Sequence, residues 1–252
     1  MTITIPLRRR ASARGRRRRR RHRIPLSSRP QPQQGDRWLQ EGESSPHLPP
    51  STAYSLVTTG GSHFLTLAVG TPPQPQAVIV DTGSTLTAFG CVPGCDFGCG
   101  THTYPFFALD KSSSARTLTC GECGTQCLDD KCLVSQRYSE GSSWRAFSVE
   151  DRVGLMGMGG TRSAGQQQAD DSAASGANDT IPFVFGCQTK LTGLFVPQKE
   201  NGIMGLSRGP ENFISRLKAA GKIPRASFSI CFDEDEEDGG RIMIGGGGAS
   251  NK

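Results

Sequence analysis

The sequence has no long apolar run. Hydrophobic residues make up 35 % of the 252 residues, and no stretch approaches the roughly 20 consecutive apolar residues that a membrane-spanning helix needs. The sequence therefore predicts no membrane segment. The apolar start of the chain is interrupted at once by Arg8, too soon for the core of a signal peptide, so we expect no signal peptide at this start.

Lysine is missing from the first 37 residues, which hold thirteen Arg and one Asp. The rest of the chain carries 16 basic and 22 acidic residues, so the net charge of +6 comes from this tail. Residues 1–52 combine the Arg run with Pro, Gln and Ser, a composition typical of a disordered segment. Such a run could bind nucleic acid by charge alone, which leaves a basic, nucleic-acid-associated protein as one alternative. No aromatic residue interleaves it, so we expect no nucleic-acid partner.

A zinc-finger pattern is also missing. The chain has nine cysteines, seven of them between Cys91 and Cys132, but Cys120 and Cys123 form the one Cys-x-x-Cys pair and no second pair stands at finger spacing. Dense local cysteines in a chain with few apolar runs favour disulfides in an oxidising compartment, with a zinc site as the alternative. We therefore expect no bound metal. Because nine is odd, at least one cysteine has a partner outside this chain or stays free.

Short apolar segments bounded by Gly and Pro predict an all-β fold with little helix. The one credible helix has Pro210 at its first position, Gly221 at its end, and an apolar face of Phe213, Ile214 and Leu217. The segment 157–180, rich in Gly, Ser, Ala, Gln and Asp, is typical of a flexible surface insertion. The predicted strands are residues 64–69, 77–80, 144–155, 181–185, 226–232 and 241–244.

Asp81 is the most informative residue of the chain. It follows the apolar run of residues 78–80 and precedes Thr82, Gly83 and Ser84, so a buried strand holds a carboxylate where the chain turns. Gly83 permits the turn and brings backbone N–H groups close to the carboxylate. The hydroxyls of Thr82 and Ser84 can donate hydrogen bonds to it. The triplet alone is also typical of an ordinary turn, but the preceding strand favours a catalytic carboxylate.

Five segments, in the same order along residues 54–245, resemble the pepsin-like aspartic proteases. They are the strand and Gly-Thr-Pro-Pro turn at 64–73, the catalytic loop at 81–84, the flap tip at 138–142, the segment behind the catalytic loop at 201–207, and the closing hairpin within 228–246. The resemblance implies a pepsin-like acid protease lobe, the amino-terminal one, over residues 53–252. It also implies that Asp81 is catalytic, supported by Thr82, Gly83 and Ser84.

The flap tip implied by the resemblance closes over a polypeptide substrate. Its substrate-binding residues are Tyr138, Glu140, Gly141 and Ser142. No cofactor is implied. The family usually has a Trp that anchors the flap tyrosine, where this chain has Ala88 with Phe89 beside it, so the resemblance does not define the resting position of the flap.

The cysteine-rich segment 85–137 is similar to the insert of the nepenthesin and plasmepsin V-like subgroup. This similarity implies a protein of the secretory pathway, in the endoplasmic reticulum, the vacuole or outside the cell. It also implies that most cysteines from Cys91 to Cys132 pair locally, whereas Cys187 pairs with the other lobe.

A second Asp-Thr-Gly or Asp-Ser-Gly triplet does not occur in the sequence. Catalysis in this family needs two carboxylates that share a proton, so we expect half an active site, a carboxy-terminal lobe as partner, and a chain that is inactive alone. The alternative from another functional class is a non-catalytic lobe that binds peptides or inhibits a complete protease.

Overall fold

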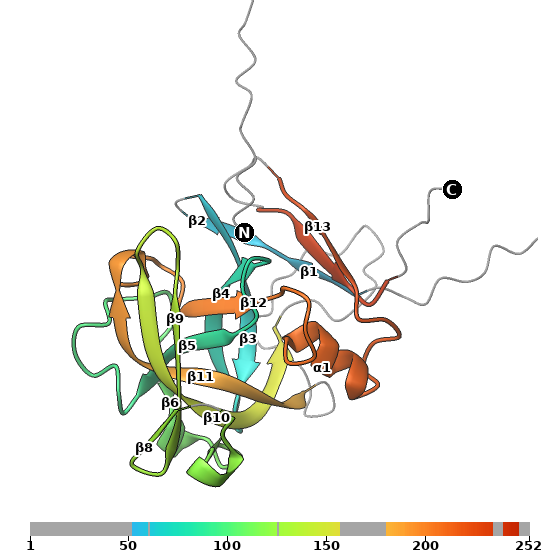
Figure 1. Cartoon of the computed structure of the whole chain (residues 1–252). Coiled ribbons are helices and arrows are strands. Elements are labelled where there is room, and N and C mark those ends of the chain that lie inside the picture. The colour runs from blue at the N-terminus through green and yellow to red at the C-terminus, as the bar shows by residue number, and fades with distance from the viewer. Residues whose placement is uncertain (1–51, 60, 125, 157–179, 234–238, 247–252) are drawn as a thin grey trace, which may run out of the picture. The chain divides into compact units, whose positions relative to one another are not determined.

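The computed structural model describes residues 52–59, 61–124, 126–156, 180–233 and 239–246. The predictions for the tail before Thr52 and for the insertion at 157–179 lie outside these residues. The described chain is mostly strand, arranged in one large and one small sheet (Figure 1). The predicted all-β fold with little helix is confirmed.

The large sheet contains six strands that close into a ring. Strands β3, β4, β12, β5, β11 and β10 are neighbours in that order, and β10 returns to pair with β3. The strands of this sheet, in spatial order, are β2 (Val57–Thr59), β3 (Ser62–Val69), β4 (Gln74–Asp81), β12 (Gly202–Gly205), β5 (Thr87–Val92), β11 (Ile181–Thr192), β10 (Ser143–Leu155), β9 (Lys131–Arg137) and β8 (Cys127–Leu128). The closed ring leaves its strands without free edges and packs against two clusters of buried apolar side chains.

The core of the ring is built from inward-facing side chains of these strands. Phe89 of β5 stacks on Phe185 of β11 with ring centroids 4.4 Å apart, and Phe107 meets both rings edge-on. All three are at most 2 % exposed. Such aromatic packing contributes apolar burial and fixes how β5 and β11 lie against each other.

Two further strands extend this sheet inside the cysteine-rich segment. Strand β6 (Phe107–Ala108) pairs with β5, and β7 (Arg116–Thr117) pairs with β10. Three 3-10 turns connect strands of this sheet: η1 (Leu109–Lys111), η2 (Cys120–Glu122) and η4 (Gly193–Phe195). The predicted insert therefore contributes strand β5 to the ring and several short elements beside it.

The predicted helix exists but begins later than expected. Helix α1 (Phe213–Ala219) starts after Asn212, whose side chain accepts a hydrogen bond from the Ser215 N–H. This N-cap satisfies a free amide of the first turn, so it sets the start and leaves Pro210 before the helix. Gly221, with φ +71°, ends the helix as predicted. Among the described residues, no helix is long and apolar enough to cross a membrane.

The small sheet joins the two ends of the described chain. Its order is β1 (Thr52–Ser55), β14 (Arg241–Ile244) and β13 (Phe228–Cys231), all antiparallel. The predicted pairing of two strands around the acidic segment is confirmed, and β1 is an additional strand. Ile242 and Ile244 of the central strand are at most 1 % exposed, so one face of this sheet is buried.

Eight of the nine cysteines form disulfides, which excludes them as thiolate ligands of zinc. Three bridges are local, as predicted: Cys95–Cys99, Cys120–Cys127 and Cys123–Cys132. The fourth joins Cys91 to Cys187, so the prediction that Cys187 pairs with another lobe is wrong. The reason is that β5 and β11 are parallel neighbours, which brings these two Cα atoms to 5.3 Å. Cys231 is the free, exposed cysteine.

We expect the Cys91–Cys187 bridge to stabilise the lobe more than any local bridge. It spans 96 residues, against 7 for Cys120–Cys127, and a longer closed loop removes more entropy from the unfolded chain. Replacing both partners by Ala should lower the free energy of unfolding by about 4–5 kcal/mol for the long bridge and about 2–3 kcal/mol for the short one. Urea unfolding of the two double variants checks this, and equal losses would contradict it.

Candidate active site

Asp81 is the last residue of β4, at the point where this strand leaves the closed ring. Strand β12 runs parallel to β4, with Gly205 beside Asp81, and antiparallel to β5 on its other side. The Leu206 N–H donates to the Asp81 carbonyl at 2.7 Å, and the Ser207 N–H donates to the Ser84 carbonyl at 2.9 Å. The backbone on both sides of the carboxylate is therefore held by β12 and the residues that follow it.

Two glycines of β12 allow this strand to lie close to β5 and to the loop between β4 and β5. A Cβ atom on Gly205 would lie 2.4 Å from the Thr85 carbonyl carbon and 2.5 Å from the Leu86 nitrogen. A Cβ atom on Gly202 would lie 2.1 Å from the Ala88 carbonyl oxygen. These contacts are with backbone atoms, which cannot rotate away, so both positions require glycine.

The Asp81 carboxylate accepts two short hydrogen bonds that orient it. The Gly83 N–H donates to Oδ1 at 2.8 Å and the Ser84 hydroxyl donates to Oδ2 at 2.5 Å. Ser84 is 8 % exposed, whereas Thr82 is exposed and makes no hydrogen bond to this carboxylate in the described structure. One oxygen thus faces the backbone turn and the other faces a buried hydroxyl, with Asp81 itself partly accessible.

The predicted flap is the hairpin of β9 and β10, with residues 138–142 as its turn. The Tyr138 N–H donates to the Ser142 carbonyl at 2.9 Å, and the Gly141 N–H donates to the Tyr138 carbonyl at 3.0 Å. Gly141 has φ +102°, a conformation that suits glycine. The turn is therefore closed by its own backbone, and Gly141 has a conformational role in it.

Tyr138 lies where the predicted flap meets the loop that follows β4. Its hydroxyl accepts a hydrogen bond from the Trp144 indole at 3.4 Å and lies near the Ser84 side chain, while the centroid of its ring lies 5.3 Å from that of Phe195. Burial raises the pKa of the Tyr138 phenol, and the carboxylates of Asp81 and Glu140 act in the same direction. The interactions with Trp144 and Ser84 act against this shift. Tyr138 is thus linked to Asp81 through one intervening side chain.

The other two predicted flap residues face opposite environments. Glu140 is exposed at the tip, near enough for its charge to act on the Tyr138 phenol. Ser142 is 2 % exposed, and its hydroxyl accepts a hydrogen bond from the Leu194 N–H at 2.9 Å. Gly193 allows this contact, since a Cβ there would lie within 3.0 Å of Ser142. Ser142 therefore fixes the flap to η4, whereas the Glu140 side chain stays exposed to solvent at the tip.

Sequence reasoning missed two residues that contact the flap tyrosine, Trp144 and Phe195. Both are at most 5 % exposed and belong to a second apolar cluster with Ala88, Leu191 and Ile203. Ala88 lacks the expected indole, and this absence was the signal that another side chain had to hold Tyr138. A Trp six residues after Tyr138 in the sequence is the signal that could have identified the second contact.

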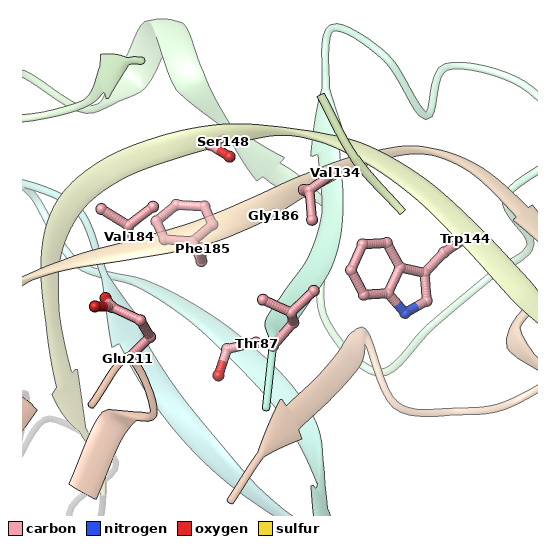
Figure 2. Close-up of a pocket in the computed structure, with 9 residues that line it drawn as sticks. Thr87, Val134, Trp144, Ser148, Val184, Phe185, Gly186 and Glu211 are labelled. Atoms are coloured by element: carbon pink, nitrogen blue, oxygen red, sulfur yellow. The ribbon is translucent and has the colours of Figure 1, made fainter. Parts of the chain in front are cut away.

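A small cavity of about 140 Å³ lies beside this cluster. Figure 2 shows Trp144 at one side of it and Glu211 with Val184 at the other. Apart from Thr87, Ser148 and Glu211, its lining is apolar. No group of three or more His, Cys, Asp or Glu side chains in the described part of the chain is placed to hold a metal ion.

Known proteins that are similar to this chain belong to one family. Residues 63–246, more than half of the chain, match the family model described as xylanase inhibitor N-terminal. The chain is 32 % identical to aspartic protease 5 of Toxoplasma gondii over 77 % of its length, 28 % to plasmepsin V of Plasmodium falciparum over 73 %, and 28 % to nepenthesin-1 of Nepenthes gracilis over 79 %. These matches span only 20 %, 29 % and 40 % of the relatives' own lengths.

The requirement for glycine at position 205 can be tested directly. Gly205→Ala should destabilise the lobe by about 3 kcal/mol, because the added methyl meets the backbone of the catalytic loop. Gly209→Ala is the matched control, since its Cβ would meet only the Thr85 methyl at 3.8 Å and should change stability by less than about 0.5 kcal/mol. Thermal unfolding of both variants decides it, and a Gly205→Ala variant as stable as the control would contradict the packing described.

Proposed function

The chain belongs to the family of pepsin-like aspartic proteases, and we propose that it supplies one half of the active site of an aspartic endopeptidase. The observation that carries this proposal is the arrangement around Asp81, a partly accessible carboxylate oriented by Gly83 and Ser84, whose charge acts on the Tyr138 phenol. A structural aspartate would not need a flap tyrosine linked to it. The substrate of such an enzyme is a polypeptide.

The proposed reaction needs a second carboxylate facing Asp81. Two carboxylates about 3 Å apart cannot both ionise, so they share one proton, a general property of such pairs. The ionised member takes a proton from a bound water, which then attacks the peptide carbonyl carbon, and the protonated member donates a hydrogen bond to the carbonyl oxygen. The pair titrates as a unit, so Asp81 would fill one of the two roles.

The second carboxylate would come from a carboxy-terminal lobe with its own Asp-Thr-Gly or Asp-Ser-Gly. This agrees with the fraction of each relative that the chain matches. The four disulfides fit an oxidising compartment. We place the protein in the secretory pathway, in the endoplasmic reticulum, the vacuole or outside the cell.

Glu140 would give this protease a preference for basic residues. It is exposed at the flap tip, and its charge acts on the Tyr138 phenol, as the charge of Asp81 does. A Lys or Arg of the substrate that lies there could donate a charge-assisted hydrogen bond to the Glu140 carboxylate. The same side chain in full contact with water would contribute close to nothing.

We expect the 252-residue chain to be inactive by itself. Without a second carboxylate, Asp81 has no partner with which to share a proton, so a denatured protein substrate should stay intact at acid and neutral pH. Co-expression with a carboxy-terminal lobe that carries the second triplet should restore cleavage. Asp81→Asn should then lower kcat roughly a thousandfold or more.

The matched control is Asp110→Asn, the same chemical change at an exposed carboxylate far along the chain, which should leave cleavage unchanged. Cleavage by the isolated chain that is lost in Asp81→Asn would contradict the need for a separate lobe and indicate that two copies pair their Asp81 side chains. A reconstituted protein that binds peptides without cleaving them would favour the non-catalytic lobe.

The role of Glu140 can be separated from general activity. In the reconstituted enzyme, Glu140→Gln should lower kcat/KM for a peptide with Arg on the non-primed side by roughly ten- to a hundredfold, the value of one charge-assisted hydrogen bond. The same peptide with Leu in place of Arg is the control and should be cleaved equally by both forms. A preference for Arg that survives the substitution would show that Glu140 is only a solvated charge.

A further inference from the structure

The side chain that holds the flap tyrosine comes from the flap itself. Trp144 is the second residue of β10, opposite Gln136 on β9 and Leu191 on β11. Its indole is 1 % exposed, and its Nε1–H donates to the Tyr138 hydroxyl at 3.4 Å. The Trp144 indole is therefore buried in the lobe and also contacts the tyrosine at the turn of the hairpin.

Small residues beneath the flap leave room for this indole. Ala88, Ala146 and Gly186 lie on three neighbouring strands, and a Cβ on Gly186 would lie 3.0 Å and 3.1 Å from the Cβ atoms of the two alanines. This surface has no bulky side chain of its own. Trp144 belongs to the same apolar cluster as Ala88 and Ala146 and lines the adjoining cavity, as Figure 2 shows.

We propose that Trp144 is the positioning residue for the flap tyrosine, taking over at position 144 the part that an indole at position 88 would play. The Tyr138 phenol that it holds lies near Ser84, and the Ser84 hydroxyl donates a hydrogen bond to the Asp81 carboxylate. Trp144 touches neither substrate nor the reacting atoms. It acts by keeping the Tyr138 hydroxyl above Ser84.

The position of Trp144 also determines which part of the flap can move. Because the indole is buried between the strands, β10 is fixed to the body at residue 144, next to the Ser143 hydroxyl that is hydrogen-bonded to Thr192. The turn at 138–142 is then restrained mainly through Tyr138 and Ser142. Opening of the flap would require the contact between Trp144 and Tyr138 to break, while the indole stays in place.

The first test uses the 252-residue chain alone and needs no activity. Trp144→Phe keeps an aromatic ring in the cluster and removes only the N–H donor. Amide hydrogen exchange at Tyr138 and Gly141, measured by NMR on ¹⁵N-labelled protein, should become about five- to tenfold faster, the effect of losing one hydrogen bond. Exchange at Val149, in the middle of the same strand, is the internal control and should not change.

A second variant removes the other partner of the same contact. Tyr138→Phe keeps the half-buried ring and should accelerate exchange at Gly141 at least as much, because it also removes the contact with Ser84. Adding Trp144→Phe to this variant should have no further effect, because the bond between the two residues is already broken. Unchanged exchange at Gly141 in both variants would overturn the proposal. So would an equal acceleration at Val149, which would indicate a general loss of packing.

The enzymatic consequence rests on the proposed function and is measured separately. In the chain reconstituted with a carboxy-terminal lobe, Trp144→Phe should lower kcat/KM by about five- to tenfold and leave the pH profile unchanged, since Asp81 is not altered. Full activity together with faster flap exchange would overturn the positioning role in catalysis. Absence of any cleavage by the unaltered reconstituted protein would contradict the proposed function, while the exchange result on the chain alone would still decide what holds the flap.

Discussion

The close contact between β12 and the loop after β4 is the constraint on which the site depends. Gly202 and Gly205 let one strand lie between two others, where any side chain would meet backbone atoms of the neighbouring segment. Hydrogen bonds from residues 206 and 207 to the carbonyls of Asp81 and Ser84 then fix the loop from behind. A carboxylate on such a backbone keeps its direction without depending on a long, mobile side chain.

Buried polar side chains extend this rigidity to the surrounding segments. Asn201, fully buried at the start of β12, accepts hydrogen bonds from the Ala77 and Tyr104 N–H groups and donates one to the Tyr104 carbonyl. Asp151, 2 % exposed, accepts from the hydroxyls of Ser112 and Ser114. Each such group would be costly to leave unpaired, so these contacts specify where the cysteine-rich segment lies on the strands. The ring is thus fastened by polar contacts as well as by its apolar core.

Local patterns in the sequence identified the elements better than the pairings between them. The apolar run before Asp81 and the turn after it predicted the strand and its end, because both signals lie within a few residues. The partner of Cys187 was wrong, since it depends on β5 and β11 being neighbours, a relation between segments almost a hundred residues apart. The start of α1 was displaced because the Asn212 cap outweighed the preference of Pro210 for a first turn. The sequence predicted that Trp144 belongs to a strand. It did not predict the contact with Tyr138, which depends on the small side chain of Ala88 on another strand.

The bridge between Cys91 and Cys187 has a consequence for how this lobe can vary in length. It ties the two ends of a 96-residue segment to adjacent strands, so the cysteine-rich region and the whole flap hairpin belong to one covalent loop. The entropy of closing such a loop grows only with the logarithm of its length, and doubling it costs about 0.6 kcal/mol. Insertions and deletions inside the loop are therefore thermodynamically cheap, whereas the strands at its two ends stay in register. The lobe can change the surface around the flap by altering loop lengths without altering the geometry of Asp81.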